Sequence, residues 1–267
     1  MPTIEMNPFS IAIFFDEKKK AEITELLNWS NAILYKIEFQ LIKDGYRKCN
    51  FLHIDPMNPE SMRIIVENNF KYRVLEQVRR YSGFAHKHYK PRNMQEALLF
   101  AAVCIDDKSL DKFSKAYMRG DHKTIGLMLG YPKCDVKFFV KHWGKHLDLI
   151  YPSAMNSKRS GDIVYFDPRL NIMLRYVGAR IIPHFPCNFQ CRKAIEFAEI
   201  ILEYLRKDNP TYTSKLLELL SKPLIFSQVN GIIQSEVFED EAFKDPLMVV
   251  IQSGYSTDTF RLKMVPG

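Results

Sequence analysis

Three side chains that can ligate a metal lie within eight positions of one another, in the stretch IIPHFPCNFQC from Ile181 to Cys191. His184 precedes Cys187 by three residues, and Cys191 follows Cys187 by four. Imidazole and thiolate groups are the usual ligands of structural zinc, and thiolates also hold iron–sulfur clusters. Two prolines in the stretch restrict its backbone, which lowers the entropy lost when ligands become ordered. The stretch is compatible with a metal site, a reactive thiol pair or two buried cysteines.

The residues around these ligands favour the first interpretation. If a helix begins at Pro186, the two cysteines share one of its faces; if it begins later, Cys187 lies in the loop and Cys191 in the first turn. Cys134, in LGYPKCD, also follows a proline of the kind that opens helices. Unsatisfied N–H groups at a helix start favour the thiolate form, which is the form that binds metal.

Two kinds of centre fit this set of residues. A mononuclear zinc site needs four ligands, which Cys134, His184, Cys187 and Cys191 would supply. A cubane iron–sulfur cluster would use the three cysteines and leave one iron for His184, a substrate or another ligand. We slightly favour the cluster. The leading prediction is therefore a metal- or iron–sulfur-binding protein, and the sequence assigns it no reaction and does not decide whether it is an enzyme.

Other interpretations of the histidines and cysteines carry less weight. Buried cysteines often act as small apolar residues, and a redox dithiol usually has C-x-x-C spacing beside a strand. A purely structural zinc knot is a third possibility. In HWGKH, His142 and His146 have zinc-compatible spacing but lack the glutamate of H-E-x-x-H, so a solvated helix face is favoured. No Walker motif, G-x-G-x-x-G or G-x-S-x-G occurs.

Positive charge concentrates in residues 71–92, which hold seven lysines and arginines against one glutamate, a balance of +6 out of a net charge of +7. Aromatic residues alternate with these cations, a combination that suits stacking on bases and pairing with phosphates. The candidate contacts are Arg79, Arg80, Tyr81, Lys87, Tyr89, Lys90 and Arg92. The alternative function is therefore a non-enzymatic accessory protein that binds RNA or tRNA.

Composition predicts a soluble globular protein, and the N-terminus, whose positive charges follow its apolar run instead of preceding it as in a secretory signal, leads us to expect a protein of the cytoplasm. Hydrophobic residues make up 46% of the 267 and charged residues 26%, as in ordinary globular proteins. The longest nearly apolar run, Ala97 to Ile105, is about half of the roughly 20 residues that a membrane span needs. In a reducing compartment the five cysteines are expected to be thiols or metal ligands and not disulfides. Cys49 and Cys104 are expected to be core residues.

Hydrophobic periodicity predicts a helix-rich α+β protein with a small C-terminal β-sheet. Helices are expected over residues 17–43, 61–81, 192–207 and 212–220, with further helices from Asn93, which would cap the first of them. Strands are expected at 10–16 and 49–56 and in the tail after residue 222. Residues 1–92 are expected to form an N-terminal unit, and residues 93–267 a second one that carries the cysteine and histidine motifs.

Two motifs resemble those of a known family. LGYPKCDVKFF, followed by LRYVGARIIPHFPCNFQC and its amphipathic helix, is similar to the domain-of-unknown-function family 483, a mostly archaeal and uncharacterised group. The resemblance covers about residues 95–240 and places Cys134, His184, Cys187 and Cys191 on the family's motif positions. Members often carry a second cysteine directly after the first, where this chain has Asp135.

Overall fold

The structure, a computed structural model, describes residues 3–7, 10–80, 90–145, 149–227, 231–239, 242–252 and 261–266. This part of the chain forms two compact units. The first unit contains the residues up to Leu34 and those from Lys141 onward, and the second contains residues 35–80 and 90–140. Both helices and sheets are present, which confirms the α+β class.

Helix α1 (Glu17–Lys43) has the bounds that the sequence predicted, and it contributes residues to both units. Its buried residues recur at three- and four-residue steps, as an amphipathic helix requires. Residue 92, where the sequence placed a domain boundary, lies among the residues of the second unit.

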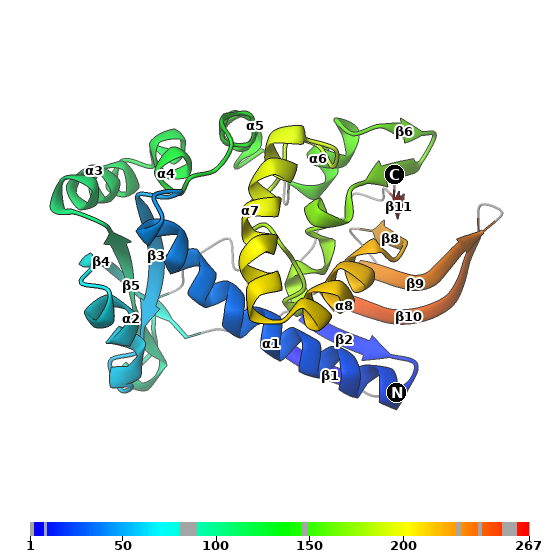
Figure 1. The fold of residues 1–267 in the computed structure, drawn as a ribbon, viewed down its shortest axis with the longest axis horizontal. Coiled ribbons are helices and arrows are strands. Elements are labelled where there is room, and N and C mark those ends of the chain that lie inside the picture. Colours follow the sequence, from blue (N-terminus) through cyan, green and yellow to red (C-terminus); the bar gives the residue numbers. More distant parts are fainter. Residues whose placement is uncertain are drawn as a thin grey trace. The chain divides into compact units, whose positions relative to one another are not determined.

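The second unit is built on a three-stranded antiparallel sheet with the order β3–β5–β4. Its strands are β3 (Cys49–Ile54), β4 (Lys71–Arg79) and β5 (Ala97–Cys104). Helices α3 (Asp107–Met118) and α4 (His122–Met128) pack on one face, and α2 (Arg63–Glu67) packs with the end of α1 on the other (Figure 1). Because both faces of β5 are covered, every residue of its sequence ALLFAAVC is apolar.

The sequence predicted helices over residues 61–81 and directly after Asn93, and the described residues of both stretches hold a strand. Residues 61–80 hold the end of a 3-10 turn (Pro59–Met62), the short α2 and then β4. A bulge between Val74 and Glu76 breaks the alternation of β4, so its apolar residues acquire helix-like spacing. Asn93 does cap a turn, since its side chain accepts the N–H of Glu96 at 2.9 Å, but this 3-10 turn (Met94–Glu96) leads into β5.

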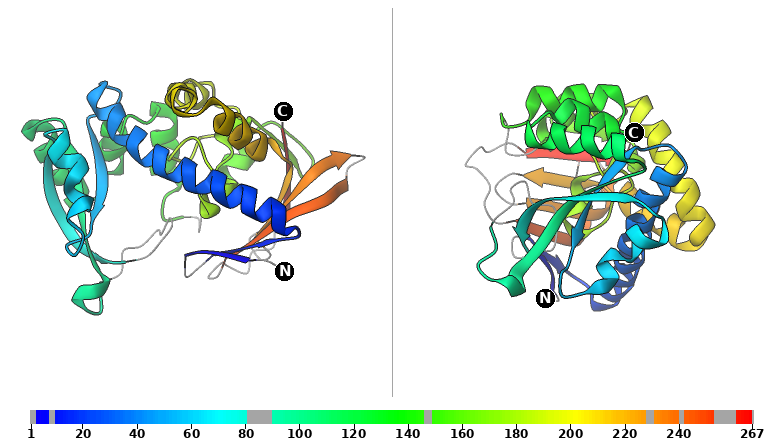
Figure 2. Two further views of the ribbon diagram at one scale, coloured as in Figure 1. Left: turned by 60° about the horizontal axis from the view of Figure 1, so that its bottom comes forward. Right: turned by 90° about the vertical axis from the view of Figure 1, so that its left-hand side faces the viewer.

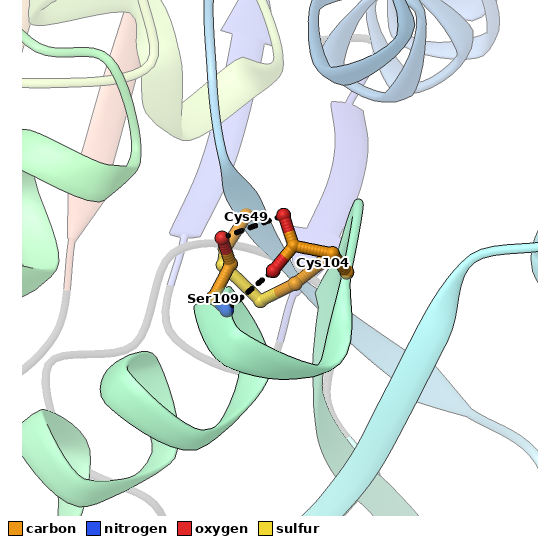
Figure 3. The surroundings of a disulfide bond; sticks show 4 residues. Cys49, Cys104 and Ser109 are labelled. Atoms are coloured by element: carbon orange, nitrogen blue, oxygen red, sulfur yellow. Dashed lines mark hydrogen bonds between the residues drawn. A yellow bond between two sulfur atoms is a disulfide. The ribbon is translucent and has the colours of Figure 1, made fainter.

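A disulfide joins Cys49, the first residue of β3, to Cys104, the last residue of β5 (Figure 3). The prediction that none of the cysteines forms a disulfide was wrong for this pair. Antiparallel pairing places the two residues directly opposite each other, with Cα atoms 4.0 Å apart, although 55 positions separate them along the chain. Both side chains are 0% exposed and belong to the core beneath α3, as expected. Beside them the Asp106 carboxylate accepts the N–H of Ser109 at 2.6 Å and so caps α3 (Figure 3).

The first unit contains an eight-stranded sheet with the order β1–β2–β10–β9–β8–β11–β7–β6. Its strands are β1 (Thr3–Asn7), β2 (Ser10–Phe14), β6 (Arg159–Ser160), β7 (Ile163–Phe166), β8 (Leu224–Ser227), β9 (Gly231–Glu239), β10 (Ala242–Gln252) and β11 (Arg261–Pro266). β11 pairs with β7 in parallel and the other neighbours are antiparallel. The N-terminal strands extend the sheet beyond the hairpin of β9 and β10 (Figure 2), so the sheet is larger than predicted.

Besides the first part of α1, three whole α-helices lie among the described residues of the first unit: α6 (Ile150–Met155), α7 (Arg192–Asp208) and α8 (Pro210–Ser221). α7 and α8 pack against each other and against a 3-10 turn, η3 (Pro168–Leu170). Another 3-10 turn, η4 (Met173–Val177), contacts β2. Among the residues that the structure describes, no helix combines the length and the apolar character that crossing a membrane needs.

A cleft of about 300 Å³ in the first unit is lined by residues of α1, α8, β9 and β10. Its apolar lining consists of Ile23, Leu26, Leu219 and Leu247. Glu236 accepts hydrogen bonds there from Lys19, at 2.5 Å, and from Lys222. Burial would raise the pKa of Glu236, but the hydrogen bonds from the two lysines outweigh it and hold that pKa below its usual value.

Candidate metal centre

Cys187 and Cys191 lie on the loop that leads into α7. The helix begins at Arg192, Cys191 is its N-cap residue, and the backbone oxygen of Cys191 accepts the N–H of Ile195 at 2.9 Å. Apolar residues recur at helical spacing only from Ala194 onward, which explains the late start. Of the two helix starts open from the sequence, the structure has the later one, so Cys187 is a loop residue.

Side chains from α6 and the two residues after it hold the backbone of this loop: Ser153, Asn156 and Ser157. The Ser153 hydroxyl donates to the Pro186 oxygen at 2.6 Å, and the Asn156 amide donates to the Cys187 oxygen at 3.2 Å. The Ser157 hydroxyl accepts the N–H of Phe189 at 2.7 Å and is itself buried. Each contact gives a backbone group of the loop a hydrogen-bond partner, so the loop that carries the two cysteines is held in one conformation.

Asn188 acts on the Cys187 sulfur itself. Its amide nitrogen lies 3.6 Å from the Cys187 Sγ as a donor, and its side-chain oxygen accepts the N–H of Gln190 at 2.9 Å. Its backbone oxygen accepts the N–H of Cys191 at 3.3 Å. A hydrogen bond donated to sulfur stabilises negative charge there, and such contacts orient metal ligands.

An ion-pair network joins α7 to the 3-10 turn η3. Arg169 of η3 donates to Asp167 at 2.5 Å and to Glu199 of α7 at 2.7 Å, and Arg206 also donates to Glu199, at 3.2 Å. Burial would raise the pKa of Glu199, but the two arginines together hold it below its usual value. The N–H of Asp167 donates to the Phe189 oxygen at 2.9 Å, so the same network reaches the cysteine loop.

Cys134 and Asp135 lie in the first turn of α5 (Lys133–His142). The helix opens at Pro132, whose oxygen accepts the N–H groups of Asp135 and Val136, each at 3.0 Å. The Asp135 side chain is only 2% exposed, and its carboxylate lies 3.6 Å from the Cys134 sulfur. A buried carboxylate beside a thiol is an expensive arrangement unless a cation or further hydrogen bonds compensate for it.

Four ligand atoms gather in a group that could hold a metal ion: the sulfurs of Cys134, Cys187 and Cys191 and a carboxylate oxygen of Asp135. These atoms all lie within 4.8 Å of one another. Asp135 and Cys191 are buried, and the other two residues are partly buried. The structure thus brings together three of the four ligands that the sequence predicted.

His184 lies outside this group, and Asp135 is the residue that sequence reasoning left out of the ligand set. The buried His184 ring packs edge-on against Phe197 of α7, with ring centroids 5.5 Å apart. The resemblance to family 483 offers one signal for Asp135, because on that resemblance the residue would fall where members often carry a second cysteine. His142 ends α5, while His146 lies outside the described residues.

The candidate nucleic-acid contacts are described only in part, because Tyr81, Lys87 and Tyr89 lie outside the described residues. Arg79 pairs with Glu96 at 3.2 Å, and Arg80 pairs with Asp55 at 2.6 Å. Lys90 and Arg92 are exposed. The carboxylates offset part of the positive charge that the sequence predicted would meet phosphates, and RNA binding stays a proposal.

Comparison of the chain with protein-family models, curated proteins and solved structures finds no match. The resemblance to family 483 therefore also stays a proposal that rests on the two motifs.

Proposed function

We propose that the protein binds one metal ion through Cys134, Asp135, Cys187 and Cys191, and that this ion is zinc. The observation that supports the proposal is the 4.8 Å limit on the separation of the four ligand atoms. A tetrahedral ion with Zn–S bonds of about 2.3 Å keeps its ligand atoms about 3.8 Å apart. The group therefore has to contract by only about 1 Å to enclose one.

The same separation favours a single ion over the cubane cluster that the sequence slightly favoured. Sulfurs on a cubane each bind a different iron, so they lie farther apart than sulfurs that share one ion. The mixed donor set also fits zinc, which accepts both thiolate and carboxylate ligands. Four protein ligands leave no open position on a tetrahedral ion, so the proposed role of the metal is structural.

Elemental analysis of protein purified without oxygen tests the proposal. We expect about one zinc per chain and far less than one iron or sulfide, and Cys187→Ala should lose the zinc because a three-ligand site binds weakly. His184→Gln is the matched control: it changes a buried residue of the same stretch that lies outside the group, and it should keep its zinc. Substoichiometric content of every metal would contradict metal binding, and stoichiometric iron with sulfide would contradict the choice of zinc.

A further inference from the structure

The segment that precedes Cys49 holds the turn that precedes Cys134. The N–H of Lys48 donates to the oxygen of Met128, the last residue of α4, at 2.9 Å. The oxygen of Lys48 accepts the N–H of Ile105, which follows β5, at 3.1 Å. One residue beside the disulfide therefore ties the end of α4 to the end of the sheet.

Gly130 brings the turn against this segment. It has a φ of +76°, and a Cβ added there would lie 2.4 Å from the oxygen of Tyr46 and 3.0 Å from Cγ of Arg47. A side chain would therefore push the turn away as well as strain its backbone. The buried guanidinium of Arg47 also lies over the ring of Tyr131, 5.6 Å from its centroid.

The turn sets the start of α5, because Pro132 follows Tyr131 directly and its oxygen accepts the N–H of Asp135 at 3.0 Å. Cys134 and Asp135 are the second and third residues of that helix. A shift of residues 46–48 would therefore move both ligands together.

The disulfide fixes residues 46–48 from the other side. It joins the first residue of β3 covalently to the last residue of β5, so Lys48 and Ile105 emerge from strand ends that are held together. Without that bond the same ends are held by hydrogen bonds and packing alone, and strand ends are the parts of a sheet that open most easily.

We propose that the Cys49–Cys104 disulfide controls the affinity of the metal centre, in that the oxidised form binds zinc more tightly than the reduced form. This inference rests on the proposed function. In the reducing step a dithiol gives two electrons and two protons, the S–S bond breaks, Cys49 and Cys104 each become a thiol, and the donor becomes a disulfide. Because both sulfurs are buried, the step requires the end of the sheet to open first.

Zinc competition with a chromogenic chelator tests this control on three samples of the full chain. These are the oxidised protein, the protein reduced by a trialkylphosphine, and the double variant Cys49→Ala/Cys104→Ala. The phosphine takes its oxygen from water, whose protons go to the two sulfurs, and alkylation followed by mass measurement counts the thiols. We expect the Kd for zinc to rise about tenfold on reduction and in the variant, as happens when other residues that position metal ligands are removed. The phosphine should leave the Kd of the variant unchanged.

Leu52→Ala is the control for general loosening of the second unit. Leu52 lies on the face of β3 that packs against α1 and α2, so its truncation leaves the disulfide and residues 46–48 in place. We expect its Kd for zinc to match that of the oxidised protein. Equal affinity in all forms, or an equal loss in Leu52→Ala, would overturn the inference and leave the proposed function standing. Failure of every form to bind zinc would overturn the proposed function itself.

Discussion

The two sets of cysteines in this chain differ in the backbone that carries them. Cys49 and Cys104 face each other across neighbouring strands and are fully buried. The remaining three, Cys134, Cys187 and Cys191, carry thiols in the first turn of α5 or in the loop that leads into α7. Antiparallel pairing brings two sulfurs together and leaves the rest of their surroundings apolar, which suits a covalent bond between them. A helix start and the loop before another bring sulfurs beside polar groups, the Asp135 carboxylate and the Asn188 amide, which suits a metal ion.

The largest expected effect comes from removing the first set. In Cys49→Ala/Cys104→Ala the unfolding free energy of the second unit should fall by about 2–5 kcal/mol, because the bond closes a loop of more than fifty residues. Hydrogen exchange of amides in β3 and β5 measures this locally. The same protection in variant and oxidised protein would show that the disulfide contributes nothing to the unit.

A smaller effect is expected when a hydrogen bond that holds the loop of Cys187 and Cys191 is removed. Ser157→Ala leaves the N–H of Phe189 without its acceptor, which costs about 1–3 kcal/mol for a buried group. The cysteine loop should loosen and the Kd for zinc should rise about tenfold. Ser214→Ala removes an exposed hydroxyl of α8 and is the matched control. Equal affinities of the two variants would show that the loop does not depend on Ser157.

The basic segment offers a test outside both cysteine sets. If residues 71–92 bind RNA, Arg79→Ala/Arg80→Ala should weaken binding several-fold and lower the salt dependence by about one unit of slope for each phosphate that is no longer neutralised. Zinc content should stay the same, since neither arginine belongs to the metal group. Titration of a labelled RNA at several salt concentrations measures both the affinity and its dependence on salt. Unchanged affinity and slope would remove the RNA proposal.

The smallest expected effect concerns the contribution of Glu236 to folding stability, and this residue is remote from both sets of cysteines in the sequence. Its pKa is lower in the folded protein than in the unfolded chain, so the stabilisation it provides is complete above about pH 5 and is lost as the pH falls through the folded value. The contribution should be about 0.5–1 kcal/mol, because the group is partly exposed. Denaturation of Glu236→Gln at several pH values should show a flatter acid limb than the original protein. Parallel pH curves would contradict the assignment.

Local pattern predicted α1, α7 and α8 well because each buries one face and exposes the other. It failed for β4 and β5 because a bulge disturbs one strand and burial on both faces removes alternation from the other. The Cys49–Cys104 bond depends on strand pairing across 55 positions, which local pattern does not contain.

The ligand group shows the same limit. Its three cysteines were predicted from residue type and from prolines at helix starts. His184 lies only three residues before Cys187 along the chain, yet its ring packs against Phe197 and lies outside the ligand group. Asp135 is adjacent to Cys134, and only the folded chain places its carboxylate within 4.8 Å of the other sulfurs. Residue type and spacing along the sequence identified candidate ligands. Which of their side chains point toward one another depends on the fold.

X-ray absorption at the zinc edge tests the central claim most directly, because it counts the atoms bound to the metal and identifies them as sulfur or as lighter atoms. The account predicts three sulfurs at about 2.3 Å and one oxygen at about 2.0–2.2 Å. Asp135→Cys should convert this shell to four sulfurs. A shell with fewer than three sulfurs in the original protein, or one that does not change in Asp135→Cys, would contradict the proposed ligand set.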